Sequence, residues 1–232
     1  MMSTTSASSP GIHWTHLSRD KARTVLAATA RVLRDSNRTL DIVEVEEITS
    51  QAQLAHLVQR GTFDTDEGRR LLRERPHLFD LDPETLRALP RGTLGREWVR
   101  FLDEHSLSLA DARLPTPHTD DETCAYVLQR LRQSHDLWHV LLGLGTRGHE
   151  EVLVHAFALA QTGLPSSVAI VVLGALKHMV LESRWECLRR DLWRAYRTGR
   201  RARPLLAVCW ERHLSEPLED VRRWLAVTPL RA

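Results

Sequence analysis

The chain has 232 residues, of which 42% are hydrophobic and 27% are charged, and its formal net charge is +2. This composition is that of an ordinary globular protein. Because 32 Lys and Arg nearly balance 30 Asp and Glu, without a long block of one sign, it gives no indication of nucleic-acid binding. The three cysteines are odd in number and not closely paired, which speaks against a zinc ribbon and a disulfide framework, so we expect a reducing, cytoplasmic location.

The N-terminal segment, MMSTTSASSPGIHWT, is small and polar. It lacks the basic end and apolar run of a secretory signal, and it is not a membrane-spanning helix. We therefore expect a disordered leader over residues 1–15 and a single folded domain over residues 16–232.

Helical periodicity dominates the rest of the chain, and no segment alternates convincingly at the strand period. Ser18 can cap a first helix, and a short third helix at 64–76 has the composition of a solvent-facing one. In chain order, helical segments are predicted at residues 19–36, 41–60, 64–76, 89–105, 122–142, 149–161, 168–181, 184–196, 205–214 and 218–225. The sequence therefore predicts an all-α protein that forms one multi-helix domain.

The most apolar run covers residues 164–176 and stops at Lys177 and His178. It is too short for a membrane span, which needs about 20 apolar residues. Three interpretations are open: the run lines a lipid-sized cavity, faces a membrane interface, or belongs to the core. We favour the core because that is the commonest role of such a run.

Charged groups interrupt another apolar segment, SHDLWHVLLGLGTRGHEEVLVH, at residues 134–155. Because successive helical residues turn by about 100°, His135, Asp136 and His139 point to one side of their helix. After the glycine-rich turn at 143–148 the chain can reverse, so that Glu151 of the next helix faces them. Two imidazoles and two carboxylates would then meet between two adjacent helices, a set suited to zinc or, with open positions, to non-haem iron.

Spacing alone leaves structural alternatives open. The two histidines and Asp136 can instead hydrogen-bond within a helical bundle. Glu150 and Glu151 can complement the positive end of a helix, and this role suits Glu150 better. His155, one turn beyond Glu151, is a candidate contact of a metal-bound residue, although a buried structural histidine is the commoner case.

Two charged clusters outside the motif are further candidates. Arg96 and Glu97, from the sequence GREW, can act as a substrate clamp or orient a metal ligand, with a helix-end salt bridge as the alternative. The basic run 197–203 can meet anionic membrane lipids or a phosphorylated ligand, but a solvated turn between helices is the default interpretation.

The motif and its flanks resemble a known family. HDLWH followed after eleven residues by Glu151 is similar to the H-D-x-x-H-x(11)-E signature of the Coq-four family, the coenzyme Q (ubiquinone) biosynthesis proteins. Four further segments resemble the family in the same order, namely LPRGTLGREWVRFLDEHSL, DDETCAYVLQRLRQSHDLWHVLLG, AFALAQTGLP and YRTGRRARPLLAVCWERHL. These matches run from about residue 90 to residue 214, more than half of the chain.

The resemblance implies an α-helical fold and a divalent metal, usually taken as zinc, beside an apolar pocket for a prenylated ring or lipid. Carried over to this chain, the metal ligands are His135, Asp136, His139 and Glu151. The family acts on the head-group of a polyprenylated hydroxybenzoate, removing the C1 carboxyl and installing a hydroxyl. We therefore expect a metal-dependent oxidative decarboxylase, with Asp136 and Glu151 as catalytic carboxylates, Zn²⁺ as the metal and Fe²⁺ as the alternative.

The resemblance also bears on partners and alternatives. His149 and Glu150 stand where the family often has Leu-Gly, and the apolar segment 168–176 diverges in detail, so the pathway can be ubiquinone biosynthesis or secondary metabolism. A lipid-binding scaffold that organises biosynthetic enzymes is the second functional hypothesis, and a structural zinc protein is the third. The expected partners are a lipophilic aromatic substrate, other biosynthetic enzymes, a membrane surface contacted peripherally and a second copy in a homodimer, but no nucleic acid.

Overall fold

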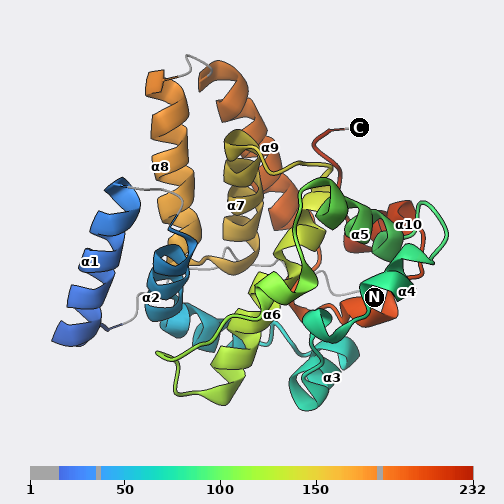
Figure 1. The fold of residues 1–232 in the computed structure, drawn as a ribbon, viewed down its shortest axis with the longest axis horizontal. Helices are drawn as coiled ribbons and strands as arrows, with labels where there is room; N and C mark the ends of the chain where they lie inside the picture. The colour runs from blue at the N-terminus through green and yellow to red at the C-terminus, as the bar shows by residue number, and fades with distance from the viewer. Residues whose placement is uncertain (1–15, 35–37, 182–184, 232) are drawn as a thin grey trace, which may run out of the picture.

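The fold, in a computed structural model that describes residues 16–34, 38–181 and 185–231, is all-α, as predicted (Figure 1). The α-helices of these residues are α1 (Arg19–Arg34), α2 (Thr39–Gln59), α3 (Asp66–Glu74), α4 (Pro83–Arg87), α5 (Leu94–Glu104), α6 (Glu122–Leu142), α7 (Gly148–Thr162), α8 (Pro165–Leu181), α9 (Trp185–Arg201) and α10 (Leu218–Leu225). Within the described ranges the only strand-like pairing is an isolated bridge between Thr93 and Pro217. The leader expected at residues 1–15 lies outside the described residues.

Local signals in the sequence set the ends of the two helices that carry the motif. The Asp121 side chain caps α6 by accepting a hydrogen bond from the Cys124 amide at 2.7 Å. Gly143 and Gly163, both with φ of +68°, end α6 and α7 in the left-handed conformation that glycine adopts without strain. These boundaries lie within a residue of those predicted.

The longest helices surround α6 and α7. Trp138 and Leu141 of α6 are fully buried, as is Phe157 of α7, whose ring meets Trp138 edge to face. In Figure 1, α7, α8 and α9 stand together, while α2 passes close to α6 and α8. Helix α9 approaches α7 closely at Gly199. A Cβ at this position would lie 2.6 Å from the Phe157 carbonyl oxygen and would clash with it. This packing fixes the position of α7 relative to α6.

Two predicted elements are corrected, and one helix is added. A continuous helix at 205–214 is wrong: two short 3₁₀ turns, Leu205–Ala207 and Trp210–Arg212, replace it. Residues 205–210 are all buried, so the segment crosses the core and has no solvent-facing side. Helix α9 continues to Arg201, so most of the basic run 197–203 is helical and not a turn. Helix α4 was not predicted, although Asp82 caps it and Pro83 starts it.

The apolar run 164–176 is only partly core. Leu164 is buried, whereas Val172, Leu173 and Leu176 expose 58%, 50% and 50% of their surface. The core interpretation is therefore wrong for the second half of the run. Among the described residues, no helix combines the length and the apolar character that crossing a membrane requires.

Candidate metal centre

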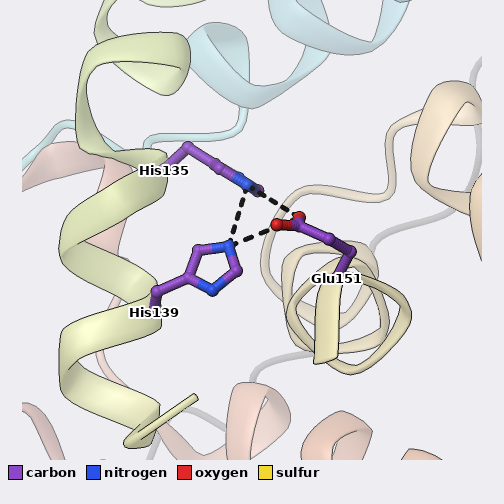
Figure 2. A group of neighbouring side chains, drawn as sticks. All are labelled: His135, His139 and Glu151. Carbon is purple, nitrogen blue, oxygen red and sulfur yellow. Dashed lines mark hydrogen bonds and ion pairs between the residues drawn. The ribbon is translucent and has the colours of Figure 1, made fainter. Parts of the chain in front are cut away.

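Three side chains of the motif converge between α6 and α7. Figure 2 shows His135 and His139 projecting from α6 toward Glu151 of α7. The two Nε2 atoms lie 3.1 Å apart, and Glu151 Oε2 lies 3.4 Å from each of them. The one-turn spacing on α6 and the reversal of the chain after Gly143 produce this arrangement, as the sequence predicts.

The size of this triangle suits a metal ion. Zinc bonds of about 2.0–2.1 Å in tetrahedral geometry place neighbouring ligand atoms about 3.3 Å apart. The observed separations of 3.1 and 3.4 Å match one face of such a tetrahedron. The donor set of two imidazoles and one carboxylate is also one that zinc and non-haem iron bind.

The surroundings of His139 fix which ring nitrogen faces the centre. Its Nδ1 donates a hydrogen bond to the Gly145 carbonyl at 2.9 Å, which leaves the Nε2 lone pair directed at the centre. The ring is 1% exposed and stacks on Phe101, with centroids 5.4 Å apart. Metal-binding histidines typically have such a partner on the second nitrogen.

The loop that carries the Gly145 carbonyl is itself held on both sides. Thr146 hydrogen-bonds with His105 Nδ1 at 3.1 Å. The buried Glu150 carboxylate accepts hydrogen bonds from the backbone N–H groups of Gly145 and Arg147, and it pairs with Arg231 at 2.5 Å. Glu150 thus caps the N-terminal end of α7, which is the helix-end role that the sequence analysis favoured for it.

Charges at the centre are coupled. Burial opposes ionisation of Glu151, but its hydrogen bond with His135 and the two imidazoles beside it hold its pKa below the usual range. Burial also opposes protonation of His135, yet the hydrogen bond and charge of Glu151 raise its pKa. The pKa of His155 falls to about 3 because burial disfavours its charged form and His135 lies beside it, with ring centroids 5.5 Å apart. His155 is therefore neutral at physiological pH.

Asp136 lies at the edge of the centre. Its carboxylate is not among the three ligand atoms that lie within 4.8 Å of one another. Burial raises its pKa, and the neighbouring His135 and His139 oppose that shift. Direct coordination by Asp136 stays a prediction.

Arg96 and Glu97 make contacts typical of a helix start. Arg96 donates to the Arg87 carbonyl, whereas Glu97 accepts from the Gly92 amide at 3.0 Å and pairs with Arg100 at 2.6 Å. These contacts match the salt-bridge alternative, and a substrate-clamping role for the pair stays a prediction.

A hollow of about 210 Å³ adjoins His135 and His155. Apolar side chains from α2, α6, α7 and α8 form most of its wall, and Ile170 is its contribution from the segment 168–176. His155 also faces Ser167 of α8, with Nδ1 3.5 Å from Oγ. The hollow is thus mostly apolar, with polar groups close to His135.

Two residues of this wall, Arg132 and Glu46, were not predicted from the sequence. Arg132 is 6% exposed in its side chain, and its Nε donates to Glu46 Oε2 at 3.0 Å. It precedes His135 by three residues on α6, a spacing that puts both on one side of the helix and that the sequence already displays. Glu46 comes from α2, and no local signal links that helix to the motif.

Comparisons with known proteins agree with one another. A family model described as "Coenzyme Q (ubiquinone) biosynthesis protein Coq4" matches residues 13–231. The Danio rerio protein named "Ubiquinone biosynthesis protein COQ4 homolog, mitochondrial" is 38% identical over 211 residues, which are 89% of this chain and 76% of that protein. The Mus musculus protein of the same name is 40% identical over 167 residues, and the match covers 70% of this chain but only 61% of the mouse protein.

A solved structure shows the same fold. The crystal structure of a candidate ubiquinone biosynthesis protein from Nostoc punctiforme matches with a TM-score of 0.69 at 24% identity, over 91% of this chain and 99% of that one. The names of the fish and mouse relatives place those proteins in mitochondria. The cytoplasmic location expected here from cysteine usage stays a prediction.

Proposed function

The chain belongs to the Coq4 family of coenzyme Q (ubiquinone) biosynthesis proteins, and we propose that it is a metal-dependent enzyme of decarboxylation and hydroxylation type. Its substrate would be a prenylated or otherwise lipophilic aromatic acid of ubiquinone-like or secondary metabolism. The observation that carries the proposal is the triangle of His135, His139 and Glu151, whose ligand atoms have the mutual distances of a metal site.

His135, His139 and Glu151 would hold the metal, with Asp136 as a further ligand, direct or through water. We propose zinc, with Fe²⁺ as the alternative. A divalent cation bound there would supply Lewis-acid stabilisation of a substrate carboxylate or phenolate. The buried, tautomer-fixed His139 supports a preorganised site, because its second nitrogen is already committed to the Gly145 carbonyl.

The chain's own residues account for binding and proton transfer. The hollow beside His135 would take the apolar part of an aromatic substrate and exclude water from it. Asp136 would accept a proton, because burial raises its pKa toward the range in which a carboxylate is an effective base. Neutral His155, next to His135, would complete the wall of the site.

Metal content and turnover measured together test the proposal. We expect about one divalent ion per chain, lost in His139→Ala, and oxygen-dependent conversion of a prenylated 4-hydroxybenzoate that a chelator abolishes. Retention of the full metal content in both His135→Ala and His139→Ala would contradict the metal site. If the metal-loaded protein binds the prenylated compound but converts none of it, the scaffold hypothesis replaces the enzyme.

A further inference from the structure

Two buried arginines of α6 differ in how they pair with acids. Arg130 is 1% exposed in its side chain, and its two terminal nitrogens donate to the two carboxylate oxygens of Glu211, each at 2.7 Å. Arg132 is 6% exposed, and it meets its acid through Nε alone, which donates to Glu46 Oε2 at 3.0 Å. Among the described residues, the terminal nitrogens of Arg132 therefore face no carboxylate.

Backbone carbonyls use only part of the remaining hydrogen-bonding capacity of Arg132. Its Nη2 donates to the Val43 carbonyl at 3.1 Å, and its Nη1 lies 3.5 Å from the Pro115 carbonyl oxygen. A guanidinium group has five N–H donors, and with Glu46 these contacts account for three of them within the described part of the chain. A cation that is buried with unused donors favours the arrival of an anionic acceptor.

Arg132 shares one hollow with the candidate metal centre. Arg132, His135 and Trp138 follow one another at three-residue intervals on α6, and all three line the hollow of about 210 Å³. Arg130 and Glu211 are not part of that wall. A ligand in the hollow would therefore meet a candidate metal ligand and a partly unsatisfied guanidinium group together.

We propose that Arg132 binds the carboxylate of the aromatic acid substrate. The inference rests on the proposed function for the class of substrate. Apolar side chains, among them Ile42, Leu131 and Ile170, would surround the aromatic ring. A carboxylate that enters such a wall loses its hydration, and this is unfavourable unless protein donors replace the lost water. The planar guanidinium group has the donor geometry that matches a carboxylate.

Glu46 would hold the guanidinium group in place without touching the substrate. This division of roles predicts different outcomes for the two partners. Loss of Arg132 removes the donor to the carboxylate, whereas Glu46→Gln keeps an acceptor oxygen for Nε and removes a negative charge that repels the substrate. If Arg132 only linked α6 to α2, its loss would affect charged and neutral ligands alike.

Calorimetric titration with 3-prenyl-4-hydroxybenzoate and with its neutral amide, 3-prenyl-4-hydroxybenzamide, tests the inference. Both compounds are titrated into metal-loaded and chelator-treated protein, and the second form isolates the arginine from the ion. We expect Arg132→Gln/Glu46→Gln to weaken binding of the acid by about tenfold or more, because a charge-assisted hydrogen bond is lost. Binding of the amide should change little, and Glu46→Gln alone should bind the acid at least as tightly as wild type.

The other buried pair of α6 is a matched control. The side chains of Arg130 and Glu211 are 1% and 19% exposed, against 6% and 17% for Arg132 and Glu46. Arg130→Gln/Glu211→Gln makes the same chemical change outside the hollow, so it should leave the affinity for the acid unchanged. Circular dichroism verifies that each variant is folded. If the Arg132 double variant does not fold, Arg132→Lys keeps the charge without the planar donors and should still bind the acid more weakly than wild type.

Equal weakening of acid and amide in a folded Arg132 variant would overturn the inference, as would equal loss of acid binding in the two double variants. Unchanged acid binding without Arg132 would overturn it as well, but would leave the proposed reaction standing. Conversely, the titrations measure no conversion of the compound. The proposed reaction can therefore fail while the preference of Arg132 for the acid is retained.

Discussion

At the scale of single residues, the centre depends on which atoms face one another. His139 has one nitrogen engaged by the Gly145 carbonyl and the other beside His135 and Glu151, so its role follows from geometry. Asp136 differs, because helical spacing places it near the ligands but does not decide whether it reaches the ion. In the structure its carboxylate stands outside the group of three converging ligand atoms. A catalytic site keeps a position for water or substrate, so one carboxylate can be dispensable for holding the metal.

Asp136→Asn separates these roles, because the amide is nearly isosteric but accepts no proton at physiological pH. We expect the variant to keep its fold and most of its metal while turnover falls by on the order of 100-fold or more. Metal content and turnover are measured in one preparation. Normal turnover would mean that Asp136 is structural, and loss of the metal would make it an essential ligand.

At the scale of helices, the elements that could be predicted are those whose ends carry capping residues in the sequence. Asp121, Gly143 and Gly163 are caps visible in the sequence, so α6 and α7, and with them the converging residues, could be predicted. The two short turns at 205–214 could not, because the burial of residues 205–210 on all sides is imposed by neighbouring helices. The exposed side of α8 could not be predicted either, because the sequence of a helix that is apolar all round does not indicate which side packs against the core.

The packing of α1 on α2 is predicted to depend on pH through Asp41. Arg31 donates to its Oδ1 at 2.9 and 2.5 Å and Arg38 donates to Oδ2, and these hydrogen bonds lower the pKa of Asp41 to about 2. The unfolded-state pKa is about 3.9, so the stabilisation is complete above that pH and is lost as pH falls toward the folded value.

Urea unfolding of wild type and Asp41→Asn across this acid range measures the effect. The stability difference between the two proteins should be present near neutral pH and shrink between about pH 4 and pH 2. Asp20→Asn is the control, because Asp20 is 95% exposed and its ion pair with Arg23 is 4.0 Å long. A difference between wild type and Asp41→Asn that stays constant with pH would contradict the assignment.

At the scale of the whole molecule, distant parts of the chain meet at the turn that carries the centre. The backbone N–H of Leu230 donates to the Leu142 carbonyl at 2.9 Å, and Arg222 of α10 donates to the carbonyls of Val140 and Leu141 at 2.8 and 2.9 Å. These contacts give the carbonyls of Leu141 and Leu142 partners at the end of α6 and add a second donor to that of Val140, which also accepts from the Gly143 N–H at 3.2 Å. The C-terminal segment therefore stabilises the end of α6, one turn from His139.

The last link of this network reaches His139, a candidate metal ligand. Arg231 pairs with Glu150, Glu150 accepts a hydrogen bond from the Gly145 amide, and the carbonyl of the same residue accepts one from His139. Glu150 thus holds Gly145, the residue whose carbonyl orients the imidazole, and partners of this kind typically contribute about 10–100-fold to metal affinity.

We therefore predict that Glu150→Ala weakens zinc binding by about tenfold or more, measured by competition with a chromophoric chelator, while helical content is retained. Arg231→Ala should have a smaller effect, because the Arg231 side chain is 49% exposed and the backbone hydrogen bonds to Glu150 remain. Arg223→Ala on α10, where the arginine pairs with exposed Asp220, should leave the affinity unchanged. If Glu150→Ala bound zinc as tightly as Arg223→Ala does, the Gly145 carbonyl would be held without Glu150, and the loop contact of Thr146 with His105 would be the support to remove next.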